Sequence, residues 1–170
     1  GKSLLSLDGF EEKTIINESA CFYDLLIKNN FCFNDKFNYY YKISINGLPG
    51  GHSGFDINKN KNNSIILLAN LIKKFDDFNL IDFYGGTKFN VIPNEATCKF
   101  YTSLSLDKIK NICNNFIAEY QNTYRDLNYK IEIINQKENS LNKNDSFNFI
   151  NFLINFPNGV IYSYNNFPTT

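Results

Sequence analysis

The order of strand-like and helical patterns in the middle of this 170-residue chain limits its fold more than any other feature. Strands and helices are expected in the order β-α-β-β-α-β. The predicted strands cover residues 39–47, 79–84, 90–102 and 129–134, and the predicted helices cover 63–75 and 105–124. This order is the split βαβ arrangement, which forms an antiparallel sheet with both helices on one face. It predicts an α+β fold, a ferredoxin-like two-layer sandwich.

The pattern of apolar residues supports these elements. Residues 39–47 are rich in aromatic and β-branched side chains, which favour a strand. The first helix carries one apolar stripe, formed by Ile65, Leu68, Ala69, Ile72 and Phe75. The second begins at Ser105, a favourable N-cap residue, with Asp107 in its first turn. Its inward side is predicted to consist of Ile109, Ile112, Cys113, Phe116, Ile117 and Tyr120.

Segments on both sides extend this core. Residues 13–23 predict one strand or two shorter ones. After a polar loop, Asp145 or Ser146 is expected to cap a short helix that runs to Ile154. Asn158-Gly159 then forms a turn into a last strand, VIYSY. The sandwich is therefore predicted to be extended by a C-terminal helix and strand.

Composition excludes several classes of partner. Lysine plus arginine and aspartate plus glutamate both number 17, so the formal net charge is zero. A nucleic-acid binder or a protein of anionic membranes would carry a basic surface, which this balance and a single arginine, Arg125, do not provide. No apolar run reaches the roughly 20 residues that span a bilayer, and the N-terminus lacks a signal-peptide pattern. With 43% hydrophobic residues, the chain is long enough for one globular domain.

The cysteine pattern gives no sign of a metal cluster. The four cysteines are Cys21, Cys32, Cys98 and Cys113, and none forms a CxxC pair. One histidine cannot complete a Cys/His zinc site with them. We therefore expect reduced, mostly buried thiols, with one disulfide pair as the open alternative.

The only histidine lies in the glycine-rich stretch GGHSG, between a predicted strand and a predicted helix. Glycines there permit positive φ and close approach of a ligand or another backbone. On such a stiff turn, His52 is placed to donate a hydrogen bond to developing negative charge; an ordinary surface histidine is the alternative. Ser53 is not expected to be a nucleophile, because no second histidine exists to act as its base.

Two other stretches carry candidate site residues. In IDFYGGTKFNVIP, Gly85 and Gly86 end one strand and Asn90 opens the next; taken alone, this is also a plain glycine-rich hairpin. In SLLSLD, Asp8 ends an apolar run, a position suited to a metal ligand but also to a helix cap or turn. Neither stretch identifies a function by itself.

Taken together and in order, these stretches resemble one family. GLPGGHSGFDI, the helix opened by Asn63, and LIDFYGGTKFNVIPNEA closely resemble the M20 metallopeptidases, best in their aminoacyl-histidine dipeptidase branch. SLLSLDGFEE and FPNGVI resemble two further segments of that branch, so the resemblance covers nearly the whole chain. It implies that residues 1–170 form one inserted lid and dimerisation domain, cut from a larger two-domain enzyme, with residues 1–12 as the junction to the catalytic domain.

The resemblance also implies roles for individual residues. In the family, a catalytic domain holds two zinc ions through His, Asp and Glu side chains; only Asp8 of this chain matches a metal ligand, so the isolated chain is expected to be inactive. His52 matches a lid histidine that hydrogen-bonds the scissile carbonyl. Asn90 matches a lid asparagine that binds substrate, and Gly85 and Gly86 keep that approach open. The implied partners are the catalytic domain of the same polypeptide, a small Xaa-His-type peptide and a second copy, in the cytoplasm.

The sequence departs from the family at several positions. Asn58 stands where a second histidine is usual, and Lys61 where an arginine near the helix start is usual, which loses bidentate geometry toward a carboxylate. These differences affect the expected substrate preference more than the reaction class. Two other functions were weighed: a stand-alone dimerisation module without catalysis, and an RNA-binding sandwich, which the charge balance disfavours.

Overall fold

A four-stranded antiparallel sheet lies at the centre of the computed structural model, which describes residues 33–34, 39–59, 61–135 and 138–160. The strand order is β4-β6-β2-β7. The strands span Tyr39–Asn46 (β2), Asn79–Gly85 (β4), Ala96–Thr102 (β6) and Asn128–Ile133 (β7). This is the order that a split βαβ sequence produces, so the predicted ferredoxin-like sheet is confirmed.

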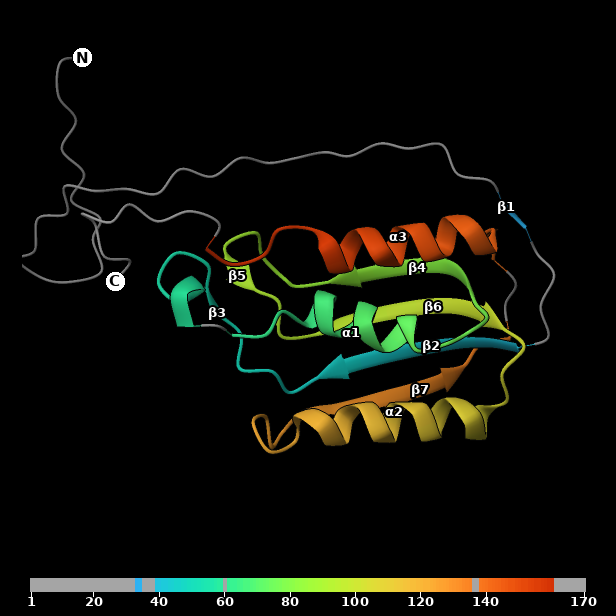
Figure 1. Cartoon of the computed structure of the whole chain (residues 1–170), viewed down its shortest axis with the longest axis horizontal. Coiled ribbons are helices and arrows are strands. Elements are labelled where there is room, and N and C mark those ends of the chain that lie inside the picture. The colour runs from blue at the N-terminus through green and yellow to red at the C-terminus, as the bar shows by residue number, and fades with distance from the viewer. Residues whose placement is uncertain (1–32, 35–38, 60, 136–137, 161–170) are drawn as a thin grey trace, which may run out of the picture.

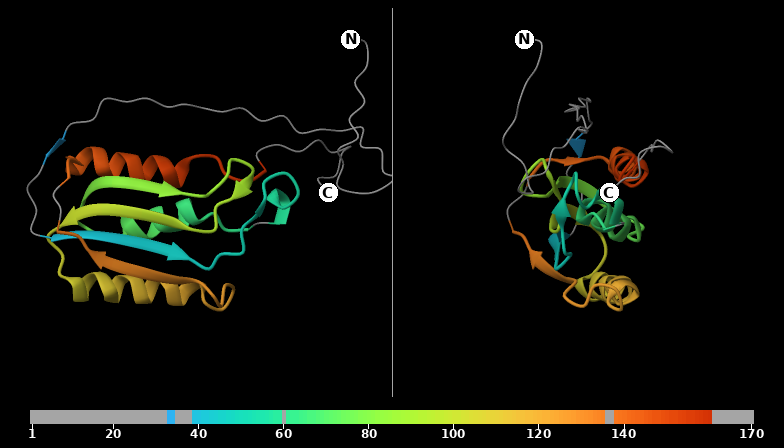
Figure 2. Two further views of the ribbon diagram at one scale, coloured as in Figure 1. Left: turned by 180° about the vertical axis from the view of Figure 1, so that it is seen from behind. Right: turned by 90° about the vertical axis from the view of Figure 1, so that its left-hand side faces the viewer.

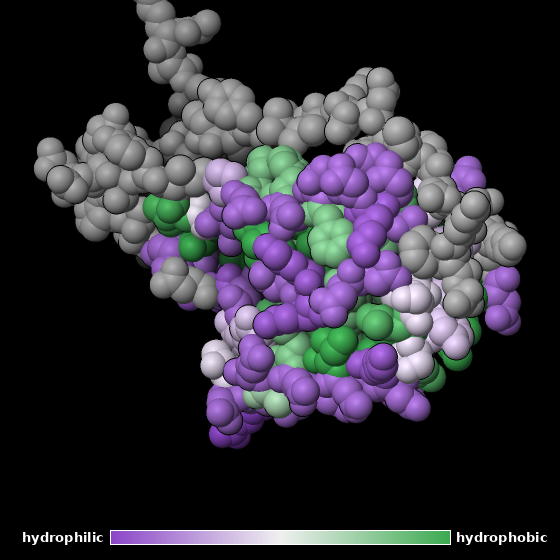
Figure 3. All heavy atoms as spheres, turned by 45° about the vertical axis from the view of Figure 1, so that its right-hand side comes forward, coloured by the Kyte–Doolittle hydropathy of each residue, from purple (hydrophilic) through white to green (hydrophobic). Residues whose placement is uncertain are grey.

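The described residues form three α-helices, and the end-on view in Figure 2 shows that they lie on the same face of the sheet. They span Ser64–Lys73 (α1), Leu106–Tyr120 (α2) and Lys143–Asn155 (α3). The third lies beside α1 and is the predicted C-terminal extension of the sandwich. The fully buried core between the two layers includes Tyr41, Ile43, Ile45, Leu68, Ile72, Phe75, Phe100 and Ile109. In the space-filling view, hydrophilic side chains dominate the visible surface and surround smaller apolar patches (Figure 3).

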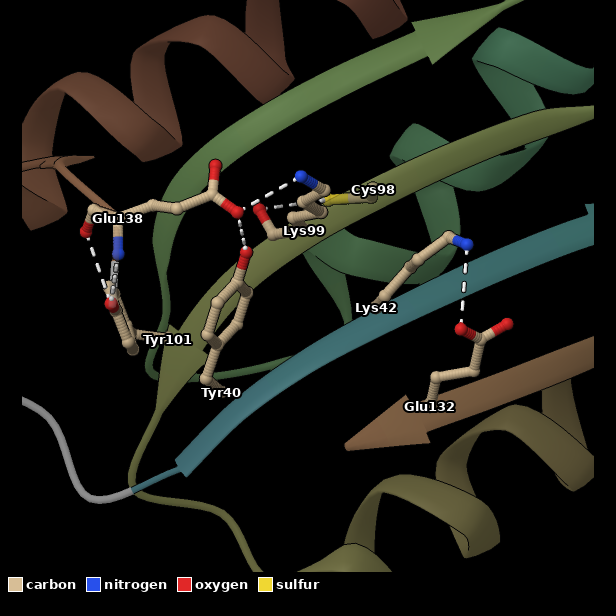
Figure 4. A network of polar contacts seen from close by, with 7 residues as sticks. All are labelled: Tyr40, Lys42, Cys98, Lys99, Tyr101, Glu132 and Glu138. Atoms are coloured by element: carbon tan, nitrogen blue, oxygen red, sulfur yellow. Dashed lines mark hydrogen bonds and ion pairs between the residues drawn. The ribbon is translucent and has the colours of Figure 1, made fainter. Parts of the chain in front are cut away.

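The opposite face of the sheet carries polar side chains that alternate with the core residues along each strand. Toward the end of this face where β2 begins and β6 ends, Glu138 from the segment before α3 accepts hydrogen bonds from the Tyr40 hydroxyl at 2.6 Å and from Lys99 Nζ at 3.0 Å. The Tyr101 hydroxyl donates to the carbonyl of Glu138 at 3.1 Å and accepts from its amide at 2.9 Å (Figure 4). A few directional bonds thus fasten this segment to the sheet.

The predicted strand at 90–102 is wrong in one respect, because it is divided into two. β5 spans Val91–Ile92 and pairs with β3, Gly51–His52, whereas β6 pairs with β2 and β4. Pro93 follows β5 and has no N–H to continue a ladder, and its carbonyl accepts from the Ser64 amide at 3.0 Å. Because of this break, residues before Pro93 pair in the β3–β5 sheet and residues after it pair in the four-stranded sheet.

The predicted start of α3 is also wrong. The N-cap is Asn142, whose side-chain oxygen accepts from the Asp145 amide at 2.8 Å, so neither Asp145 nor Ser146 is the cap. A short strand, β8 (Ser140–Leu141), lies within the predicted loop and pairs with β1 (Phe33–Asn34). The predicted Asn63 start of α1 is confirmed by a bond from the Ile65 amide to Asn63 Oδ1 at 2.9 Å.

Some predicted features lie outside the described residues. These are the apolar run that ends at Asp8, the one or two strands expected at 13–23, Cys21, Cys32 and almost all of the last strand. Cys98 and Cys113 are described and are buried free thiols, as expected. Burial raises the pKa of Cys113 to about 12, which keeps it protonated and unreactive at neutral pH.

Candidate functional site

The predicted site residues His52 and Asn90 meet at one end of the sheet, where β2 and β4 both end (Figure 1). The two strands of the β3–β5 ladder pair Gly51 with Ile92 and His52 with Val91. One residue further, the Ser53 amide donates to the carbonyl of Asn90 at 3.0 Å. Backbone bonds therefore hold the histidine turn against the hairpin that carries Asn90.

The residues after His52 form a tight turn around it. The His52 amide donates to Asp56 Oδ2, and the Asp56 amide donates to the His52 carbonyl, both at 2.8 Å. The Gly54 amide donates to His52 Nδ1 at 3.1 Å. An imidazole that accepts at Nδ1 carries its proton on Nε2 in the neutral form, so Nε2 is the atom that can donate.

Two phenylalanines lie close in the sequence to the predicted site residues, Phe55 to His52 and Phe89 to Asn90. The ring of Phe55 lies 5.0 Å from the imidazole of His52, in a tilted arrangement. Phe89 immediately precedes Asn90, and 81% of its surface is exposed. The imidazole therefore has an aromatic neighbour on its own turn, and the residue next to Asn90 in the sequence is an exposed phenylalanine.

Asp56 connects the histidine turn to two lysines. Its Oδ1 lies 2.8 Å from Lys59 Nζ and 3.4 Å from Lys61 Nζ. The bond from Lys59, together with the His52 amide and Lys61, lowers the pKa of Asp56 from 3.8 to about 2. The carboxylate is ionised at neutral pH, and with its two lysines it forms a cluster with one excess positive charge.

Gly51 makes room for this cluster. A Cβ atom at Gly51 would lie 2.6 Å from Asp56 Oδ2 and 2.7 Å from Lys61 Nζ, closer than real Cβ contacts allow. Its neighbour Gly50 has a φ of 61°, which favours glycine. Glycine is thus favoured at these two positions for different reasons: Gly50 has a positive φ, and Gly51 leaves space that a Cβ atom would occupy.

Gly85 and Gly86 lie at the end of β4, before the hairpin that carries Asn90. A Cβ atom at Gly85 would lie 2.7 Å from Ile65 Cγ1, and the nearest contact at Gly86 would be Pro93. Gly86 has a φ of 76°, and its amide donates to the carbonyl of Glu95 at 3.1 Å. Their contacts in the structure are thus with the first helix and the hairpin, and their predicted role in substrate approach stays a prediction.

A cavity of about 400 Å³ opens beside the β3–β5 ladder and the start of α1. Its lining includes Ser53, Lys61, Asn62, Asn63, Val91 and Asn158. Asn63 Nδ2 donates to Asn158 Oδ1 at 3.0 Å, which joins the predicted PNG turn to the helix cap. The cavity wall is both polar and apolar, with Ile57, Ile92 and Pro93 on its apolar side and one cationic side chain, so it suits a small ligand that carries an anionic group.

Within the described residues, no group of three or more His, Cys, Asp or Glu side chains is placed to hold a metal ion. The predicted ligand Asp8 lies outside the described part of the chain. The described residues alone do not supply a metal-binding set.

Sequence reasoning missed Asp56. It lies four positions after His52, and a carboxylate at that spacing after a turn can reach back to the backbone of the first residue. That short-range signal was available, but the pairing with Lys61 depends on the path of the chain between them.

Comparison with known proteins agrees with this architecture. The family model of the M20 peptidase dimerisation domain matches residues 40–128. The chain is 31% identical over 130 residues to the cytosol non-specific dipeptidase of Escherichia coli (strain K12), a match covering 71% of this chain and 27% of that protein. The chain therefore spans about a quarter of the length of this relative.

A solved structure shares the fold. The aminoacylhistidine dipeptidase from Vibrio alginolyticus superposes with a TM-score of 0.70 and 24% sequence identity, over 82% of this chain and 31% of that chain. None of the helices in the described ranges is long and apolar enough to cross a membrane. The family match over more than half of the sequence and the 31% identical relative show that this chain belongs to the M20 peptidases, as their dimerisation domain.

Proposed function

We propose that this chain is the lid and dimerisation domain of a zinc-dependent dipeptidase, and that His52 donates a hydrogen bond to the scissile carbonyl. The observation that supports the proposal is the fixed position of the imidazole and the hydrogen bond that its Nδ1 atom accepts. The imidazole is fixed on a short ladder beside Asn90, and Nδ1 accepts from the Gly54 amide, so the proton lies on Nε2.

This geometry suits stabilisation of an oxyanion. Hydrolysis of a peptide bond places negative charge on the carbonyl oxygen, and a fixed donor aimed at that oxygen stabilises the transition state more than the ground state. Loss of one such donor elsewhere costs about 3–4 kcal/mol of barrier. A donor on a turn held by backbone bonds needs little reorganisation as the charge develops.

Asn90 and Lys61 supply the remaining contacts that a dipeptide needs. The side chain of Asn90 binds the substrate backbone or its terminal carboxylate, and Lys61, on the wall of the cavity, attracts that carboxylate. Lysine acts there as a point charge, without the bidentate fork of an arginine. Gly85 and Gly86 have no side chains that would obstruct the approach of the substrate to Asn90.

The activity itself belongs to the full-length enzyme. The chain spans about a quarter of its curated relative, and catalysis needs two zinc ions held by the catalytic domain, with Asp8 as the one ligand from residues 1–12. The metals supply the activated water. The proposed substrates are Xaa-His-type dipeptides, the partners are the catalytic domain and a second copy, and the location is the cytoplasm. The isolated chain is inactive.

Two substitutions of His52 in the full-length enzyme test the proposal. His52→Asn keeps an acceptor close to the position of Nδ1, so the turn is retained, but it loses the donor at Nε2. We expect kcat to fall about 10²–10³-fold, as for loss of an oxyanion donor. His52→Gln reaches further with an amide donor and is expected to recover part of the rate. Lys108→Ala, an exposed change on α2, is the control. A wild-type kcat for His52→Asn rules out the assignment.

A second role is compatible with the first and is favoured by the family match, which is to a dimerisation domain. The chain then associates with a copy of itself in the absence of any catalytic domain. Light scattering of the 170-residue chain at rising concentration measures this. A monomer at every concentration contradicts a self-sufficient dimer interface, without bearing on His52.

A further inference from the structure

We infer that Asp56 is a positioning residue for His52: it fixes the direction of the imidazole and ties it to Lys61 on the cavity wall. The inference rests on the proposed function of His52 as a donor. The effect of Asp56 on the position and tautomer of the imidazole can be measured by NMR, independently of catalytic activity.

Two hydrogen bonds close a ring between the residues at the ends of the turn. The His52 amide donates to the Asp56 side chain, and the Asp56 amide donates to the His52 carbonyl. Both distances are 2.8 Å, and the first bond has an ionised acceptor, which makes it stronger than a neutral one. The peptide groups on both sides of His52 are therefore fixed, and with them the direction in which its side chain leaves the backbone.

The imidazole then meets a second constraint inside that ring. The Gly54 amide donates to Nδ1 at 3.1 Å, and the Phe55 ring lies 5.0 Å away. Both groups belong to the segment that Asp56 closes. If the ring opens, Gly54 and Phe55 move together with it, so the acceptor bond at Nδ1 and the position of the Nε2 proton depend on Asp56.

Asp56 is itself held from the other side. Lys59 and Lys61 pair with its Oδ1 while Oδ2 accepts from His52, so each oxygen has a separate task. Gly51 leaves the space in which this cluster lies against the backbone. Since Lys61 also lines the cavity, one carboxylate sets the relative placement of the imidazole donor and of the cation proposed to attract the substrate carboxylate.

The chain has a single histidine, so its imidazole nitrogen signals in NMR have only one source. For the neutral imidazole of the wild-type chain we expect the tautomer with the proton on Nε2, because Nδ1 accepts from the Gly54 amide. Asp56→Ala should give a mixture of tautomers, whereas Asp56→Asn keeps an acceptor for the His52 amide and should retain most of the wild-type signal. Lys59→Ala, which leaves the ring closed, is the matched control. An unchanged imidazole spectrum for Asp56→Ala overturns the inference.

Kinetics of the full-length enzyme test the catalytic consequence. Misplacement of a catalytic group by about 1 Å costs up to roughly 10²-fold. We expect kcat to fall about tenfold to a hundredfold for Asp56→Ala, and less for Asp56→Asn. In a His52→Asn background, Asp56→Ala should lower kcat no further, because its effect on kcat acts through His52, whereas displacement of Lys61 should appear in KM. An equal loss in both backgrounds shows a general structural effect and overturns the positioning role. A different combination separates the two claims. If His52→Asn keeps the wild-type kcat while Asp56→Ala changes the imidazole spectrum, the proposed function of His52 is wrong but the control of the imidazole by Asp56 stands.

Discussion

The carboxylate of Asp56 links acid stability to the geometry of the histidine turn. Hydrogen bonds from Lys59, His52 and Lys61 lower its pKa from 3.8 to about 2 in the folded chain. A lowered folded pKa adds stability above the unfolded pKa, and that stability is lost as the pH falls toward 2. The carboxylate thus contributes fully at neutral pH.

The difference in unfolding free energy between wild type and Asp56→Asn should therefore be constant above about pH 5 and shrink below about pH 4. Urea unfolding at a series of pH values measures it. Lys59→Ala should weaken this pH dependence without removing it, because His52 and Lys61 remain. A difference that stays constant down to pH 3 would contradict the assignment.

Gly51 offers a test of the same cluster by steric means. Alanine there would place Cβ 2.6 Å from Asp56 Oδ2, so the carboxylate must leave the His52 amide and Lys61. We expect Gly51→Ala to return the pKa of Asp56 toward its ordinary value, measured by carbon-13 NMR titration. Gly54→Ala, whose Cβ would make only ordinary contacts at 3.4 Å with the imidazole, is the control. Equal titration of Asp56 in both variants would show that space at Gly51 is unimportant.

At the level of residues, the sequence indicated some parts of the site and missed others. The glycine-flanked His52 and the Asn90 hairpin were identified from motifs, and the structure places them side by side through the β3–β5 ladder. Asp56 was missed because its contacts are with a backbone amide and with Lys61, neither of which a motif reveals. Asp8 lies outside the described residues and stays a prediction.

At the level of elements, Ser146 joins the start of α3 to the sheet. Its hydroxyl accepts from the Leu80 amide at 2.8 Å and donates to the carbonyl of Asn142 at 2.7 Å, and the residue is fully buried. Leu80 lies next to an irregularity in the β4–β6 pairing. The serine therefore satisfies a strand amide that would otherwise be buried without an acceptor.

Ser146→Ala should lower the free energy of unfolding by about 1–3 kcal/mol, the cost of leaving a buried donor unsatisfied. Urea denaturation measures this. Ser105→Ala at the N-cap of α2 is the matched control: Ser105 makes no side-chain cap bond in the structure, so a change within about 0.5 kcal/mol is expected. Equal losses in the two variants would argue against a special role for the buried hydroxyl.

Elements that depend on nearby residues in the sequence were predicted well, and those that depend on contacts with distant residues were not. The apolar stripe and the Asn63 cap predict α1 almost to the residue. The division at Pro93 depends on β3, a partner that lies far away in the sequence, so residues 90–102 alone suggest one strand. The start of α3 depends on Asn142, which was hidden among many polar residues of the same kind.

At the level of the whole molecule, the helix-free face of the sheet is held to the segment before α3 by the Glu138 cluster. Burial and the bond to Glu138 raise the pKa of Tyr40, and the Tyr40 hydroxyl, followed by Lys99, lowers the pKa of Glu138. These groups come from β2, β6 and the connection between β7 and α3. Their bonds connect parts of the fold that no local pattern joins.

Tyr40→Phe removes the hydroxyl and keeps the ring. We expect a loss of about 1 kcal/mol of unfolding free energy, because a bond to a charged but partly exposed acceptor is lost. Thermal or urea unfolding measures it. Tyr84→Phe, on the exposed side of β4, is the control and should change stability by less than about 0.5 kcal/mol. A neutral Tyr40→Phe would show that the Tyr40 hydroxyl is not needed to hold the segment, which the bonds from Lys99 and Tyr101 still fasten.

The overall topology was predictable because only a few arrangements fit the order of elements. A β-α-β-β-α-β sequence with right-handed crossovers gives one sheet order with both helices on one face. The additional helix beside α1 was expected from its sequence, but its place was not, because it depends on which apolar surface the first two helices leave uncovered.

The separate β3–β5 ladder has a consequence for how such a domain can diverge. His52 lies on β3, and Asn90 directly precedes β5, the strand that pairs with β3 outside the four-stranded sheet. Exposed positions on the same hairpin, such as Lys88 and Phe89, are absent from the buried core. Substitutions there should cost little folding free energy, and under the proposed function they would change which ligand is accepted. Selection on specificity and selection on stability can therefore act on different residues of one small domain.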